Sequence, residues 1–169
     1  PESPRRLVLL SLRQEEAEEV VALLEPERGD VELVPAWGDI FTLAEIFHER
    51  QYEIRTVIAE SPLIIDAGAN IGLASLWMSG LYPGARIHAF EPEPVNFKLL
   101  EHNLRSLPHA RAERAALGNR NGTITLELSE HGAMHSVSES GAADGLTVRL
   151  SRLDTYLSDH DIPFVDLLK

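Results

Sequence analysis

A short stretch near the middle of the chain combines an acidic residue with glycines. It reads DAGANIG, from Asp66 to Gly72, and it follows the apolar residues 63–65. Gly68 has no Cβ, so its backbone can adopt a positive φ and come close to a ligand. A second acid, Glu91, follows the apolar stretch RIHAF. Because the carboxyl ends of parallel strands border one crevice, we expect both carboxylates to face a ligand there.

Two classes of ligand bind at a turn of this kind. A dinucleotide site uses G-x-G-x-x-G and places a pyrophosphate against the helix N-terminus. Here Asp66 replaces the first glycine and the last is displaced to Gly72, so a carboxylate would repel the phosphates. S-adenosylmethionine instead carries a sulfonium and an ammonium group, and Glu91 would accept hydrogen bonds from its ribose hydroxyls. The simpler alternative is that Asp66 caps the next helix and Glu91 is an exposed loop acid.

Strands and helices alternate around these two acids. The stretches PLIID, ARIHAF and ARAERAAL are predicted strands, and IGLASLWMSGLY and PVNFKLLEHNLRSL are predicted helices with apolar stripes. TITLELS and LTVRLS follow as strands with period-two alternation, then RLDTYLSDHDI as a helix and turn and PFVDLLK as a terminal strand. This order predicts βαβ units and an α/β fold, a Rossmann-like, doubly wound and mostly parallel sheet.

Composition excludes several kinds of protein. The 169 residues are 44% hydrophobic and 25% charged, which indicates one compact globular domain. The absence of cysteine excludes disulfides and thiolate metal sites. A formal net charge of −12 argues against nucleic-acid partners. No apolar run reaches the ~20 residues of a membrane helix, and no signal peptide opens the chain, so we expect no membrane partner and a cytoplasmic location.

The chain divides into two parts. Residues 1–37 form an N-terminal strand and helix extension, and residues 38–169 form the main domain. The last residue, Lys169, lies within a predicted buried strand that has no turn or polar tail after it. Such a strand leaves apolar surface and backbone groups unpaired. We therefore expect the chain to be part of a longer protein, with the sheet truncated at its fourth core strand.

Several stretches resemble one family. LIIDAGANIGLASLW, ARIHAFEPEPVNFKLLEHNL, AALGNRNGTITL and LSRLDTYL…IPFVDLLK are similar to the FkbM family of class I S-adenosylmethionine-dependent methyltransferases, over about residues 38–169. The resemblance implies the class I fold and transfer of a methyl group, usually to a hydroxyl oxygen of a small molecule or sugar. It implies a first cofactor loop of Asp66, Gly68, Ala69, Asn70 and Gly72.

The same resemblance implies individual roles. Asp66 would lie near the methionine amine, directly or through water, and Glu91 would hold the ribose. Pro92 would pack near the adenine. Ala116 and Leu117, at the end of the third predicted strand, would line the adenine pocket.

The catalytic base is the least defined part of the prediction. A hydroxyl acceptor needs a base or a metal ion to activate it, and no metal-ligand motif stands out. His135 is our candidate base because its glycine- and serine-rich loop can fold over the crevice; a solvated loop histidine is the alternative. Two other functions stay open: an inactive cofactor-binding or interaction domain, and a nicotinamide-dependent dehydrogenase. The sequence determines neither the acceptor nor the oligomeric state.

Overall fold

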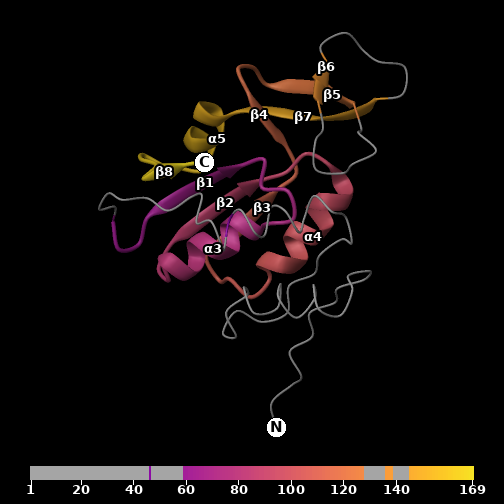
Figure 1. Cartoon of the computed structure of the whole chain (residues 1–169). Helices are drawn as coiled ribbons and strands as arrows, with labels where there is room; N and C mark the ends of the chain where they lie inside the picture. The colour runs from indigo at the N-terminus through magenta and orange to yellow at the C-terminus, as the bar shows by residue number, and fades with distance from the viewer. Residues whose placement is uncertain (1–45, 47–58, 128–135, 139–144) are drawn as a thin grey trace, which may run out of the picture.

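The computed structural model describes residue 46 and residues 59–127, 136–138 and 145–169 (Figure 1). The predicted N-terminal extension and the boundary at residue 38 lie outside these residues, so both stay predictions. Eleven elements follow one another in the described part: β1 (Leu63–Ala67), α3 (Leu73–Leu81), β2 (Arg86–Phe90), α4 (Pro94–Leu104), β3 (Ala110–Glu113), β4 (Ala116–Gly118), β5 (Gly122–Glu127), β6 (Ser136–Ser138), β7 (Leu146–Arg152), α5 (Leu153–Asp159) and β8 (Leu167–Leu168).

The first sheet has the order β3-β2-β1-β8, and every neighbouring pair in it is parallel. Ala67 at the end of β1 pairs with Phe90 at the end of β2, so these strands stop at the same edge. On the other side of β1, Ile65 pairs with Leu168 of β8. The predicted parallel sheet is confirmed, and its register brings the residues after β1, β2 and β8 to one edge.

Helices cover both faces of this sheet (Figure 1). Ile64 and Ile87 belong to a core cluster with residues of α3 and α4, whereas Leu63 and Ile65 belong to a second cluster with Tyr156 of α5. Successive side chains of a strand point to opposite faces, and a strand buried on both faces reads as a continuous apolar run. The apolar run at the start of β1 is therefore explained by burial on both faces of the sheet. The predicted doubly wound arrangement is confirmed.

The start of α4 follows from its sequence. Pro94 occupies the first turn, where its missing N–H leaves no hydrogen bond unmade. Glu93 caps the helix, since its Oε2 accepts a 2.6 Å hydrogen bond from the Asn96 amide. The buried residues Leu100 and Leu104 then turn one side of α4 toward the core. This helix packs behind the glycine turn that follows β1.

A second sheet of order β4-β7-β5-β6 lies beside the first (Figure 1). Strands β4 and β7 are parallel, while β5 is antiparallel to both β6 and β7. The expectation that ARAERAAL is one strand is wrong, because β3 ends at Glu113 and β4 begins at Ala116 in the other sheet. Between them the Ala115 amide donates to the Glu113 carbonyl at 3.0 Å, and Ala115 is completely buried. A tight turn at this buried alanine therefore lies between the two strands.

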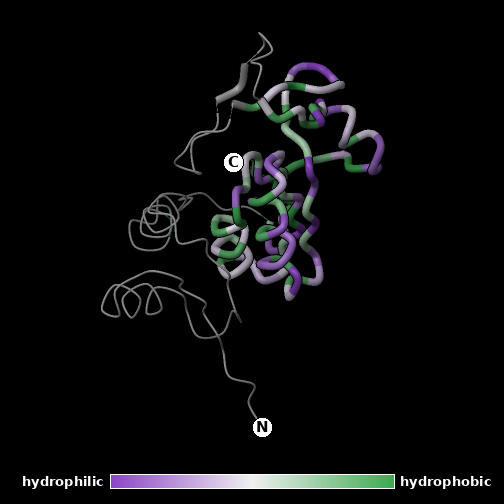
Figure 2. The backbone as a smooth tube through the Cα atoms, turned by 90° about the vertical axis from the view of Figure 1, so that its right-hand side faces the viewer, coloured by the Kyte–Doolittle hydropathy of each residue, from purple (hydrophilic) through white to green (hydrophobic). Residues whose placement is uncertain are grey.

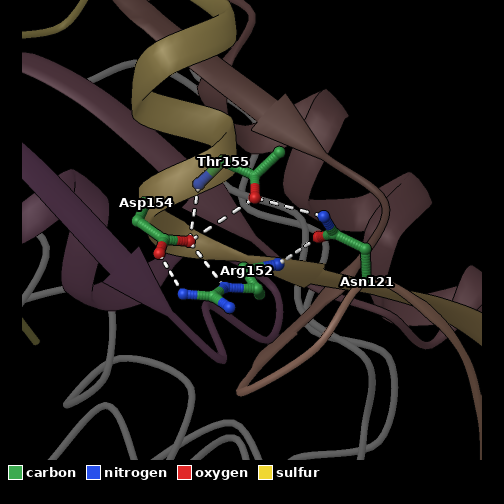
Figure 3. Close-up of polar contacts among 4 residues, drawn as sticks. All are labelled: Asn121, Arg152, Asp154 and Thr155. Atoms are coloured by element: carbon green, nitrogen blue, oxygen red, sulfur yellow. Dashed lines mark hydrogen bonds and ion pairs between the residues drawn. The ribbon is translucent and has the colours of Figure 1, made fainter.

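Polar contacts fix the junction between β7 and α5 (Figure 3). The Asn121 side chain accepts a 2.7 Å hydrogen bond from the Arg152 amide and donates to Thr155 Oγ1 at 3.1 Å. Asp154 pairs with the Arg152 guanidinium and accepts from the Thr155 amide at 2.7 Å. These groups are exposed, where solvent screens an ion pair and leaves it little effect on stability. Their main effect is to set the direction in which the chain enters α5.

Hydrophobic and hydrophilic residues alternate along the backbone without separating into an apolar and a polar end (Figure 2). Most large apolar side chains of the described residues are buried, and the most exposed of them is Phe164 at 68%. In the described part of the chain, every helix is too short or too polar to cross a membrane.

Two glycines of the turn after β1 allow a matched stability test. Gly72 has φ +92°, and a Cβ there would lie 2.8 Å from Leu100 Cδ1. Gly68 has φ +71°, and a Cβ there would meet nothing within 4 Å. We expect Gly68→Ala to lower the free energy of unfolding by about 1 kcal/mol through backbone strain alone, and Gly72→Ala by about 2–4 kcal/mol through strain plus overpacking. Urea denaturation of both variants measures the difference, and equal losses would contradict this packing of α4 on the turn.

Candidate functional site

The turn after β1 is built from residues with left-handed backbone conformations. Gly68, Asn70 and Gly72 have φ of +71°, +52° and +92°. The amides of Gly68 and Ala69 both donate to the Phe90 carbonyl, at 3.0 and 2.9 Å, and the Gly72 amide donates to the Ala69 carbonyl at 2.8 Å. These bonds attach the turn to the end of β2. The predicted cofactor loop is therefore a compact turn at the carboxyl edge of the parallel sheet.

Glu91 connects this turn to the segment that precedes α4. The residue is 5% exposed; its Oε2 accepts from the Asn70 amide at 2.9 Å and its Oε1 accepts from the Glu93 amide at 2.9 Å. The alternative that Glu91 is an exposed loop acid is thus wrong. A carboxylate oxygen can accept more than one hydrogen bond, so these two bonds are compatible with a further bond to a ligand hydroxyl.

Asp66 is completely buried and paired within the chain. Its Oδ2 accepts a 2.6 Å hydrogen bond from Ser75 Oγ of α3, and its Oδ1 lies 2.8 Å from Lys169 Nζ after β8. Asp66 does not cap α3, because that helix has Gly72 at its N-cap and no side-chain cap bond. Neither partner was predicted from the sequence. Lys169 also donates to the Gly68 carbonyl at 3.3 Å, so it contacts the turn as well as the acid.

Two features of the turn fit an adenosyl ligand. The space over Gly68 is open, since a Cβ built there meets no atom of the described residues within 4 Å. Asn70 Oδ1 is buried and accepts no hydrogen bond from the described residues, and an unpaired buried polar atom is unusual in a folded protein. The first feature leaves room for a ligand close to the backbone, and the second offers an unsatisfied hydrogen-bond acceptor.

The other predicted adenine-site residues lie in different places. Pro92 borders a cavity of about 420 Å³ together with Pro94, Glu113, Arg114 and residues 146–149. Ala116 and Leu117 are not at the end of the third strand, as expected, but in β4, where they pair with β7. Leu117 packs against the cluster under α5. The cavity is therefore bounded by the ends of β2 and β3 and by β7, with neither of these two residues in its lining.

The predicted base lies outside the described residues, because His135 belongs to residues 128–135. Within the described residues, no group of three or more His, Asp or Glu side chains is arranged to hold a metal ion. The part of the candidate site that the structure describes is thus the turn after β1 and its supports.

A polar cluster that the sequence analysis missed lies on the α5 face of the sheet. Tyr156 Oη is 2.7 Å from His88 Nδ1 and donates to Glu113 Oε1 at 3.2 Å. The Tyr156 ring packs against Phe90 and His160, with ring centroids 4.8 and 4.1 Å away. Burial, followed by the nearby Glu113 carboxylate, raises the pKa of Tyr156. The tyrosine therefore stays neutral, links β2, β3 and α5, and packs against the ring of Phe90, whose carbonyl holds the turn.

Comparisons with known proteins all identify methyltransferases. The sequence profile of the methyltransferase FkbM domain matches residues 66–169. The chain is 43% identical over 89 residues to "Methyltransferase sdnD" of Sordaria araneosa, a match that covers 51% of this chain and 34% of the relative. It is 34% identical over 99 residues to "31-O-demethyl-FK506 methyltransferase FkbM" of Streptomyces tacrolimicus, which covers 57% of this chain and 38% of the relative. Each match thus spans little more than a third of the relative's length.

A solved structure was also found. The crystal structure of a methyltransferase FkbM from Methylobacillus flagellatus KT aligns with 83% of this chain and 37% of its own, at 14% identity and a TM-score of 0.44.

Protonation of His88, which contacts Tyr156 in the polar cluster on the α5 face, is expected to make the stability depend on pH. Burial and the charges of Arg111, His160 and Arg86 lower the pKa of His88, with Glu113 opposing them. The unfolded chain therefore takes up a proton near pH 6.5 while the folded protein resists it. We expect stability to fall as pH drops from about 7 through the lowered pKa of His88.

Denaturant midpoints at several pH values measure this effect. His88→Gln removes the titrating group and should flatten the acid side of the profile, whereas His109→Gln, at an exposed histidine, is the matched control. A profile that keeps its full slope in His88→Gln would contradict the assignment.

Proposed function

The chain belongs to the methyltransferase FkbM domain family, and from this premise we propose that it binds S-adenosylmethionine at the turn of residues 66–72 and takes part in methyl transfer. Its fold is the α/β, mostly parallel arrangement of class I methyltransferases. The observation that carries the proposal is the turn itself, open over Gly68 and held from one side by Glu91 and from the other by Lys169.

The two sides of the turn would receive different parts of the ligand. Glu91 lies directly after β2 with its carboxylate fixed by two backbone amides, so it would accept hydrogen bonds from the ribose hydroxyls. The open backbone at Gly68 and Ala69, beside Asp66, would receive the amino-acid tail. Pro92 follows Glu91 and borders the 420 Å³ cavity, which is the natural place for the adenine. An adenine contact with Ala116 or Leu117 remains a prediction.

The reaction proposed is methyl transfer to a hydroxyl oxygen of a small molecule or sugar. S-adenosylmethionine supplies an electrophilic methyl group when it is bound. The contribution of this chain's turn is positional: Glu91 and the residues after β1 would hold the ligand in one orientation, and alignment of reacting atoms provides much of the rate in such displacements. The acceptor proton must pass to a base, and His135 is the residue that we propose for this step.

The alternatives make different predictions about ligands. The relatives are about three times as long as the stretch that each match covers, so the acceptor and the activity are proposals about the whole protein. A domain that kept the pocket without the chemistry would bind S-adenosylhomocysteine and transfer nothing. A nicotinamide-dependent enzyme would bind NAD instead.

Calorimetric titration tests the proposed ligand. We expect S-adenosylhomocysteine to bind and NAD not to bind. Glu91→Ala should weaken the first ligand at least tenfold, because loss of a hydrogen bond to a charged acceptor costs about 1.5–3 kcal/mol. Glu101→Ala, at an exposed acid of α4, is the control and should bind normally. Binding of NAD alone, or full affinity in Glu91→Ala, would refute the ribose assignment.

A further inference from the structure

The cation that pairs with Asp66 comes from the far end of the described chain. Lys169 Nζ lies 2.8 Å from Asp66 Oδ1 and 3.3 Å from the Gly68 carbonyl oxygen. We propose that Lys169 is a positioning residue that fixes the half of the turn receiving the amino-acid tail of the cofactor. This inference rests on the proposed function. It adds to it a residue that acts on the ligand through the turn and is separate from Glu91, the residue proposed to bind the ribose.

The charge balance requires such a partner. The Asp66 side chain has 0% exposure and the Lys169 side chain 18%. A buried carboxylate without a cation is strongly destabilised, and removal of one partner from a buried pair is costly because the other charge remains. Lys169 therefore offsets the charge of Asp66 and, with Ser75, sets the orientation of the carboxylate.

The backbone of Lys169 is held in place by the sheet. The Ala67 amide donates to the Lys169 carbonyl at 3.0 Å, and the Lys169 amide donates to the Ile65 carbonyl at 2.9 Å. These bonds continue the pairing between β1 and β8, so the backbone of Lys169 is fixed beside Asp66. Its side chain then bridges the end of β1 and the Gly68 carbonyl, which sets the direction of the peptide unit after Gly68.

The other half of the turn has its own support. The Asn70 amide is held by Glu91, and the Gly68 and Ala69 amides are held by the Phe90 carbonyl. Loss of the Lys169 ammonium would therefore disturb Asp66 and the Gly68 carbonyl while the Glu91 contacts remain. The effect on a ligand should be confined to the part that lies near Gly68.

Two ligands separate a local effect from a general one. S-adenosylhomocysteine carries the amino-acid tail, and 5′-methylthioadenosine lacks it but keeps the adenosine. We expect Lys169→Met to weaken S-adenosylhomocysteine about tenfold or more and to change methylthioadenosine less than about twofold. Lys98→Met changes the only other lysine of the chain, which is exposed on α4, and should alter neither affinity. Equal losses for the two ligands, or unchanged binding of both, would overturn the proposal.

A measurement on the unchanged protein decides the matter if Lys169→Met does not fold. Mild acetylation followed by mass spectrometry reports the reactivity of Lys169 relative to Lys98. S-adenosylhomocysteine should slow acetylation of Lys169 severalfold and methylthioadenosine should not; equal rates with the two ligands would overturn the positioning role. If the unchanged protein binds neither ligand, the proposed function is refuted, and this inference with it. If both ligands bind but change the acetylation rate of Lys169 equally, only this inference is refuted.

Discussion

A carboxylate buried at the end of β1 constrains the elements around it. Asp66 has no solvent exposure, and an unpaired charge in a protein interior costs several kcal/mol. Ser75 of α3 and Lys169 after β8 supply its partners. Strand β1, helix α3 and strand β8 must therefore meet at one point. This requirement places β8 next to β1 and brings the start of α3 close beneath the turn.

The glycine turn takes its shape from the same point. Lys169 holds the Gly68 carbonyl, Glu91 holds the Asn70 amide, and α4 completes the support because the Asn103 side chain donates to the Ile71 carbonyl at 2.7 Å. Left-handed residues alternate with ordinary ones along the turn, a conformation that glycine and asparagine adopt at low cost. Glu91 thus stabilises the turn directly and Asp66 does so through Lys169, and their value for a ligand follows from the shape that they maintain.

The sequence predicted the frame of the site better than its contacts. Alternating apolar strands and amphipathic helices were enough to place Asp66 and Glu91 at adjacent strand ends, because parallel strands finish at one edge. The ion pair with Lys169 joins residues 103 positions apart and depends on the register of β8, which no local pattern specifies. The contact between Tyr156 of α5 and His88 of β2 also joins residues far apart in the sequence, so no local pattern specifies it. The break in ARAERAAL was missed because β3 and β4 pair in two different sheets, and this tertiary arrangement overrides the local strand propensity.

The pairing of Asp66 changes the physical basis of ligand choice. A free carboxylate at the turn would repel a diphosphate, but Lys169 offsets that charge. A diphosphate site also needs backbone amides that point at the ligand. Here the amides of Gly68, Ala69 and Gly72 donate to carbonyls of the chain, and the Asn70 amide donates to Glu91. These four amides are used within the chain and would not serve a phosphate, so we expect the turn to suit a ligand that brings donors of its own, such as ribose hydroxyls and an ammonium group.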